Sequence, residues 1–127
     1  MRPTADVARD LVRLATLFPD HPIRLQECGY ASGAGCGGSE AAQADFVSAV
    51  FDAWDQLADR LVHVDFTWQH DVSTTTVDGW VTAYGMSGHP HEDAFRAYLA
   101  TLGLHHHDGS AKPAWDRLTV EAAARGW

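Results

Sequence analysis

The chain has 127 residues and a formal net charge of -8, with 17 acidic residues against nine Lys and Arg. This length suits one domain with its own hydrophobic core, so we treat residues 1–127 as a single unit. The acidic balance argues against nucleic acid or an anionic membrane as a partner, because both bind through basic surfaces. No apolar run could span a membrane, and the first residues lack the apolar core of a signal peptide, so the sequence predicts a cytoplasmic protein.

The first predicted elements are a helix over residues 4–18 and a strand over residues 23–27. Apolar residues recur at helical spacing in the first segment and alternate with polar residues in the second. The strand delivers Glu27 to its C-terminal end, where the glycine-rich loop 31–38 follows. Because α/β proteins place reactive groups at this end of a strand, Glu27 is the first candidate for chemistry.

A second helix is predicted from its N-cap Ser39 to about residue 60, and a second strand over residues 61–70. The apolar side of this strand is predicted to consist of Val62, Val64, Phe66 and Trp68. Two strands that are separated by one helix are normally parallel and joined by a right-handed crossover. A sheet of two parallel strands has two open edges, so we expect association to complete it.

The rest of the chain is predicted to form a loop and two more helices. Residues 71–88 are typical of a loop, with room for a short helical turn. A third helix is expected over residues 91–102, and a last one over about 112–125, where Pro113 suits the first turn. The predicted fold class is therefore α/β, with two parallel strands and about four helices.

Cysteines and histidines suggest two further features. Cys28 and Cys36 flank the glycine-rich loop, so a disulfide could join them, whereas free thiols are expected in a reducing compartment. Histidines gather at residues 89–91 and 105–107, but neither group has the i, i+4 spacing of a zinc-hydrolase helix. We therefore predict no metal and no cofactor.

Several segments together resemble one known family. They are residues 22–30, 39–55 and 66–71, and the tail 102–115 with its Asp-Gly and Lys-Pro-Ala-Trp runs. These segments are similar to the C-terminal part of (β/α)8-barrel glycoside hydrolases of the large retaining clan. The resemblance implies that Glu27 corresponds to the nucleophile at the end of the seventh strand. It also implies that Trp68, at the end of the eighth, belongs to the sugar-binding floor, and that the chain represents the last two β/α units of a barrel.

The chain departs from this family in its size and in its carboxyl groups. A complete barrel has about 250 residues, and the family's acid/base glutamate at the end of its fourth strand has no counterpart here. Retaining hydrolysis needs two carboxyl groups about 5 Å apart, and one copy places only Glu27. Four copies with two strands each could close an eight-stranded barrel and gather several Glu27 carboxylates.

Two functional hypotheses follow. The first is a glycosidase-like homo-oligomer, such as a tetramer, in which Glu27 is the nucleophile or general base and a carbohydrate contacts Tyr30, Trp68, His70 and Asp71. The second is a non-catalytic carbohydrate-binding or self-assembling barrel fragment that lacks the general acid. A structural remnant without a ligand is the third alternative, with Glu27 as a solvated carboxylate, Trp68 in the core and Asp71 as a cap.

Overall fold

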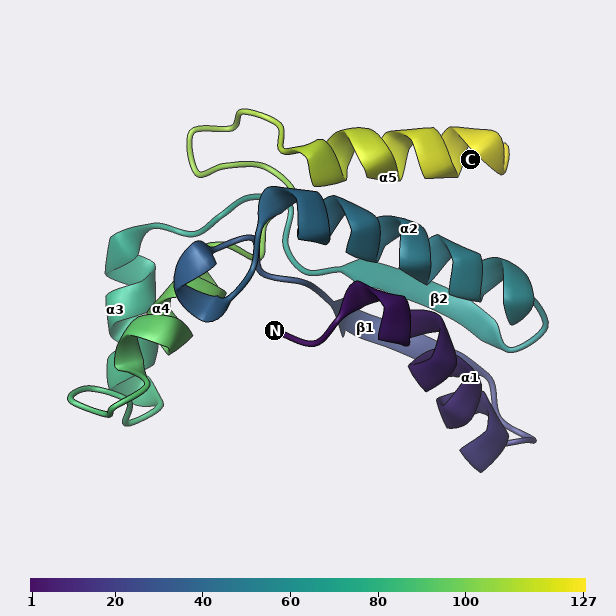
Figure 1. The fold of residues 1–127 in the computed structure, drawn as a ribbon, viewed down its shortest axis with the longest axis horizontal. Coiled ribbons are helices and arrows are strands. Elements are labelled where there is room, and N and C mark those ends of the chain that lie inside the picture. Colours follow the sequence, from purple (N-terminus) through teal and green to yellow (C-terminus); the bar gives the residue numbers. More distant parts are fainter.

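The computed structural model describes all 127 residues and shows helices packed around one two-stranded sheet (Figure 1). None of the helices is both long and apolar enough to cross a membrane. Five α-helices are present, one more than predicted. In chain order the elements are the 3-10 turn η1 (Thr4–Asp6), α1 (Val7–Leu17), β1 (Ile23–Cys28), the 3-10 turn η2 (Ala34–Cys36), α2 (Glu40–Gln56), β2 (Leu61–Phe66), α3 (Thr74–Ala83), α4 (Glu92–Ala100) and α5 (Pro113–Ala124).

The two strands pair in parallel, as the sequence predicts, and their ends coincide. At the start, the Ile23 N–H donates to Arg60 O at 2.7 Å, and at the end the Thr67 N–H donates to Cys28 O at 3.1 Å. The prediction that the second strand continues to residue 70 is wrong, because β1 ends at Cys28 and offers no partner beyond Thr67. The C-terminal ends of both strands therefore lie at one edge of the sheet.

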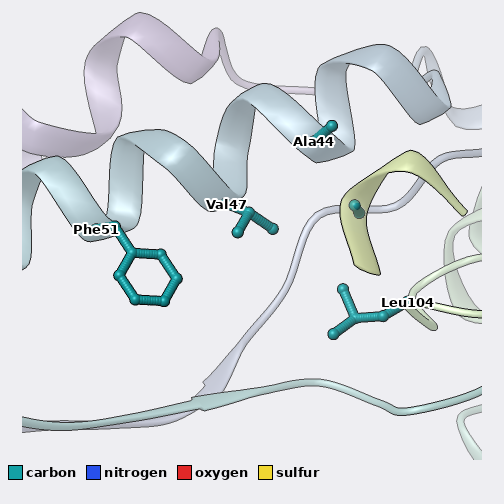
Figure 2. Packing of buried hydrophobic residues seen from close by; sticks show 5 residues of the cluster. Ala44, Val47, Phe51 and Leu104 are labelled. Carbon is teal, nitrogen blue, oxygen red and sulfur yellow. The ribbon is translucent and has the colours of Figure 1, made fainter. Parts of the chain in front are cut away.

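Helix α2 covers one face of the sheet and is covered in turn by α5 (Figure 1). Its predicted N-cap is confirmed, since the Ser39 Oγ accepts the Ala42 N–H at 3.1 Å. Figure 2 shows Val47 and Phe51 directed from α2 toward the sheet, in a cluster that includes Leu104. This cluster joins the middle of the chain to the segment that precedes α5.

Helix α1 packs over the beginning of the sheet, where Ala15, Ile23 and Leu61 form a second buried cluster. Val62, which the alternation assigns to the apolar side of β2, is 45% exposed. The cause is a register shift between β1 and β2 just after Ile23. Such a bulge turns one extra residue away from the regular alternation, so Val62 is left at the free edge of β2.

Helix α3 replaces most of the loop predicted over residues 71–88. It starts at the N-cap Ser73, whose Oγ accepts the Thr76 N–H at 3.1 Å. Val77 and Val81 lie one helical turn apart and are buried against Leu99 of α4. The prediction of a loop was wrong because the three threonines of the first turn have low helix propensity, whereas burial of these two valines stabilises the helix.

The chain has a larger accessible surface than a compact monomer of the same mass. The accessible surface is 7331 Å² for 13.8 kDa, whereas a compact monomer of this mass exposes about 6,600 Å². Only 19 residues are buried. One reason is the sheet face opposite α2, where Arg24, Gln26, His63 and Asp65 are all exposed. Parallel sheets are normally covered on both faces, so this face and the strand edges are uncovered in the single chain.

Candidate binding groove

A groove of about 500 Å³ runs along the free edge of β1. Residues 24–30 form one continuous wall of the groove, from the strand into the following loop. The opposite side comes from the N-terminal segment and from helices α1, α2 and α4, namely Met1, Arg2, Pro3, Val7, Asp10, Leu11, Phe46, Val50 and Tyr98. The groove therefore follows the strand edge and ends near the loop after Cys28.

Glu27 lies in this groove, one residue before the end of β1. Its side chain is exposed, and its carboxylate makes neither an ion pair nor a hydrogen bond within the chain. Arg24 also lines the groove and has no acidic partner within 4 Å. The groove thus holds one free carboxylate and one free guanidinium, both available to a ligand.

Tyr30 and Tyr98 supply aromatic surface to the same groove. The Tyr30 ring is buried 5.4 Å from the ring of Phe46, and its hydroxyl donates to Arg2 O at 3.2 Å. Tyr98 is 38% exposed, so its ring is the more accessible of the two. The sequence does not reveal that Tyr98 lines this groove, because no local pattern brings α4 next to the strand edge.

Trp68 and His70 do not line the groove. The Trp68 ring lies 5.1 Å from the ring of Trp80, at the cluster that α3 and α4 form. The exposed His70 packs its ring 5.0 Å from that of His105. The structure therefore separates these two predicted contacts from Glu27 and Tyr30 and places them on the side of α3 and of the loop before α5.

Asp71 takes part in a buried ion pair. Its Oδ1 accepts from the Lys112 Nζ at 2.7 Å and from the Gly103 N–H at 2.9 Å. Lys112 is only 1% exposed and also donates to Ser32 Oγ at 3.0 Å and to Gly103 O at 2.9 Å. The carboxylate of Asp71 is thus occupied by contacts within the chain, which connect the segments that follow both strands.

Gln43 of α2 supports the loop that follows β1. The side chain is buried, and its Nε2 donates to Tyr30 O at 2.9 Å, to Leu102 O at 3.2 Å and to Gly103 O at 3.1 Å. Its Oε1 has no partner. These bonds satisfy carbonyl groups of the irregular backbone and fix the position of Tyr30 at the end of the groove.

Both cysteines are free, so the structure does not contain the disulfide that we considered. Burial raises the pKa of the Cys28 thiol to about 12, so this thiol is protonated at neutral pH and is a poor nucleophile. The Cys36 Sγ contacts Gly33 O at 3.1 Å. No three His, Cys, Asp or Glu side chains converge in a way that could hold a metal ion.

The chemistry open to this groove is set by its carboxyl groups. Asp10 also lines it, but its carboxylate lies 2.8 Å from the guanidinium of Arg2. Glu27 is left as the free acceptor, whereas retaining hydrolysis needs a second carboxyl group about 5 Å away. Through Glu27, one chain can therefore accept hydrogen bonds from a ligand's hydroxyl groups. Comparisons with protein-family models, curated proteins and solved structures found no match.

Proposed function

We propose that this chain is a glycosidase-like unit that binds a neutral carbohydrate at the C-terminal end of β1. The observation that carries the proposal is the exposed, unpaired carboxylate of Glu27 on a groove that also presents Tyr98. A carboxylate accepts hydrogen bonds from sugar hydroxyls, and an aromatic ring packs against the apolar face of a pyranose. A neutral ligand is favoured because the chain carries a net charge of -8.

The dimensions of the groove support a small saccharide. Its volume of about 500 Å³ lies within the range of roughly 300–1,000 Å³ that is usual for small-molecule pockets. Its lining is mainly apolar, with Glu27, Gln26 and Arg24 as polar groups on one wall. A few polar groups on an apolar lining are what orients a ligand in such a pocket.

We assign binding, and not hydrolysis, to the single chain. Glu27 would act as a hydrogen-bond acceptor, with Tyr30 fixing the loop beside it. Glycoside hydrolysis belongs only to an assembly in which another chain brings a carboxyl group to within about 5 Å of Glu27. In that case Glu27 would attack the anomeric carbon and the second group would protonate the leaving oxygen.

Calorimetric titration with neutral β-linked and α-linked oligosaccharides tests the proposal. We expect binding that Glu27→Gln weakens by about tenfold or more, since a hydrogen bond to a charged group contributes about 1.5–3 kcal/mol. Tyr98→Ala should also weaken it. Tyr84→Ala is the matched control, because Tyr84 is 70% exposed and lies outside the groove. The proposal fails if no saccharide binds at millimolar concentration, or if Glu27→Gln and Tyr98→Ala leave the affinity unchanged.

A further inference from the structure

We propose that the free edge of β1 pairs with the free edge of β2 from a second copy of this chain. Copies would then join head to tail, and their strands would form one continuous parallel sheet. The partner is a second copy because one chain carries both halves of this interface. The inference goes beyond the saccharide proposal and holds whether or not a sugar binds.

The first support is the unpaired backbone at both edges. The sheet has only two strands, so each strand is paired on one side. The Ile23 N–H points toward β2, where it donates to Arg60 O at 2.7 Å. Because neighbouring residues of a strand direct their peptide groups to opposite edges, the N–H and C=O of Arg24 face the groove. An exposed edge of this kind is a template for another strand.

The second support is the apolar surface beside each edge. The groove along β1 contains Val7, Leu11 and Leu25. A second cleft of about 180 Å³ lies along β2, and its apolar lining includes Phe51, Trp54, Val62 and Trp127. Apolar surface on both sides of the contact would be removed from water when the edges meet, which stabilises the association.

The third support is charge complementarity between the two strands. Arg24 of β1 and Asp65 of β2 are exposed, and neither makes an ion pair within the chain. They share the sheet face opposite α2. When β2 of one copy lies beside β1 of the next, Asp65 of the first copy can approach Arg24 of the second. Such opposite charges on facing strands favour the pairing and help to set its register.

The fourth support is the area available for burial. The chain exposes about 700 Å² more than a compact monomer of its mass, by the comparison of 7331 Å² with about 6,600 Å². A standard protein interface takes about 800 Å² from each partner. Head-to-tail contacts close into a ring when the rotation between copies permits it, and four copies with two strands each supply the eight strands of a closed barrel.

The proposed strand pairing uses the same groove as the proposed saccharide site. A docked β2 would occupy the length of β1 that begins at Arg24, at the start of the groove. Glu27 and Tyr30 lie at the other end, where the strands of a parallel sheet present their C-terminal residues. Because β2 has six residues, a docked copy would also run beside Glu27, and strand and saccharide would compete for the β1 edge.

Sedimentation velocity without sugar, from micromolar to millimolar protein, tests the inference. We expect the wild-type mass to rise with concentration and Val62→Lys to raise the dissociation constant by about tenfold or more, since lysine on an edge strand opposes edge pairing. Val120→Lys is the matched control, because Val120 is also exposed (64%) but lies on α5. A wild-type chain that stays monomeric, or a Val62→Lys chain that associates as wild type does, would overturn the inference.

A mixing experiment tests the specific contact. Arg24→Asp and Asp65→Arg should each weaken association alone, because each makes like charges face each other. In an equimolar mixture the two variants restore opposite charges at every contact, so association should return to near the wild-type level. Failure of the mixture to associate better than either variant alone would overturn the proposed pairing. Circular dichroism of each variant confirms that it is folded, and because no sugar is present, the outcome is independent of the saccharide proposal.

Discussion

The Nζ of Lys112 lies 2.7 Å from the Oδ1 of Asp71 in the interior of the chain. Lys112 immediately precedes α5, and Asp71 lies in the segment between β2 and α3. The ammonium group also donates to Ser32 and Gly103, so its donors are satisfied by oxygen atoms from three segments. A buried charge is tolerated when it is paired and hydrogen-bonded in this way. The pair therefore joins the loops after both strands to the start of α5.

Lys112→Met should destabilise the fold strongly. The substitution keeps an apolar stem of similar length but leaves the carboxylate of Asp71 without its cation. Removing one partner of a buried ion pair costs about 3–5 kcal/mol, and the free energy of unfolding in urea should fall by that amount. Arg13→Met is the control, since Arg13 is exposed on α1 and makes no ion pair or hydrogen bond.

Adding Asp71→Asn to the Lys112→Met chain separates lost charge pairing from lost packing. The double variant no longer buries an unpaired carboxylate, so we expect it to recover part of the stability. If Lys112→Met unfolds at the same urea concentration as the wild type, the ion pair does not stabilise the fold.

Gly103 marks the point where the segment before α5 touches the segment after β2. A Cβ at this position would lie 2.2 Å from the Asp71 N and 2.2 Å from the His70 C. Both are backbone atoms, so relieving the clash would require the chain itself to move. Gly103→Ala should therefore lower the free energy of unfolding by about 1–3 kcal/mol or more, as overpacking does. The measurement is again urea unfolding.

The control for this prediction is Gly79→Ala. Gly79 lies within α3, and a Cβ there meets nothing within 4 Å. Alanine should raise stability by about 0.5–1 kcal/mol, because it restricts the unfolded chain and suits a helix better than glycine. Equal effects of the two substitutions would contradict the close approach at Gly103.

Local sequence patterns predict an element correctly where the spacing of its apolar residues matches the side chains that the fold buries. The alternation around Ile23 and Leu61 indicated two strands, and the helix between them indicated their parallel pairing; both are confirmed. The exposure of Val62 could not be predicted, because it results from a register shift between strands and not from the alternation within one. Likewise, the threonines at the start of α3 concealed a helix that the burial of Val77 and Val81 stabilises.

The candidate site was only partly visible in the sequence for a related reason. Glu27 and Tyr30 are candidates from the sequence because they lie close together on one strand and its loop, and both line the groove. Tyr98 reaches the same groove from α4, which no short-range spacing reveals. In the sequence, Lys112 is a charged residue just before a helix that starts with proline, so it is expected at the surface. Its partner Asp71 is 41 residues away. Only the three-dimensional structure shows that this lysine is buried.

Arg125 joins α5 to α2 near the C-terminal end of the chain. Its guanidinium bonds to Asp55 and Glu121, and these bonds hold the pKa of each carboxyl group below its usual value. A carboxyl group with a lowered pKa in the native state stabilises the fold above its unfolded pKa, and this contribution is lost as the pH falls. Arg125→Met should therefore lower the melting temperature at pH 7.

The pH dependence is the distinguishing part of this prediction. As the pH falls below the unfolded pKa values, 3.8 for Asp55 and 4.5 for Glu121, the unfolded carboxyl groups bind protons before the native ones do, and the native ones follow at lower pH. The difference in melting temperature between wild type and Arg125→Met should then shrink. Thermal unfolding followed by circular dichroism between pH 7 and pH 3 measures it. A difference that stays constant over this range would show that Arg125 acts through packing on Phe51, 4.8 Å away.

The thiol of Cys28 should resist alkylation in the folded protein. Its pKa is raised to about 12 by burial, and the thiolate is the reactive form. In a Cys36→Ser chain, which keeps Cys28 as its single thiol, iodoacetamide at pH 8 should label the denatured protein quickly and the native protein far more slowly. Mass spectrometry over time measures both rates. Equal rates in the two states would contradict the burial of this thiol.

The same raised pKa makes the fold sensitive to alkaline pH. The unfolded thiol loses its proton near the reference value of 9.0, whereas the native thiol keeps it up to about pH 12. Between these values the unfolded state binds fewer protons, so the free energy of unfolding decreases as the pH rises. This contribution is complete below pH 9 and lost progressively toward pH 12. Cys28→Ala removes it, so the stability of that variant should fall less steeply above pH 9 than that of the wild type in urea unfolding series.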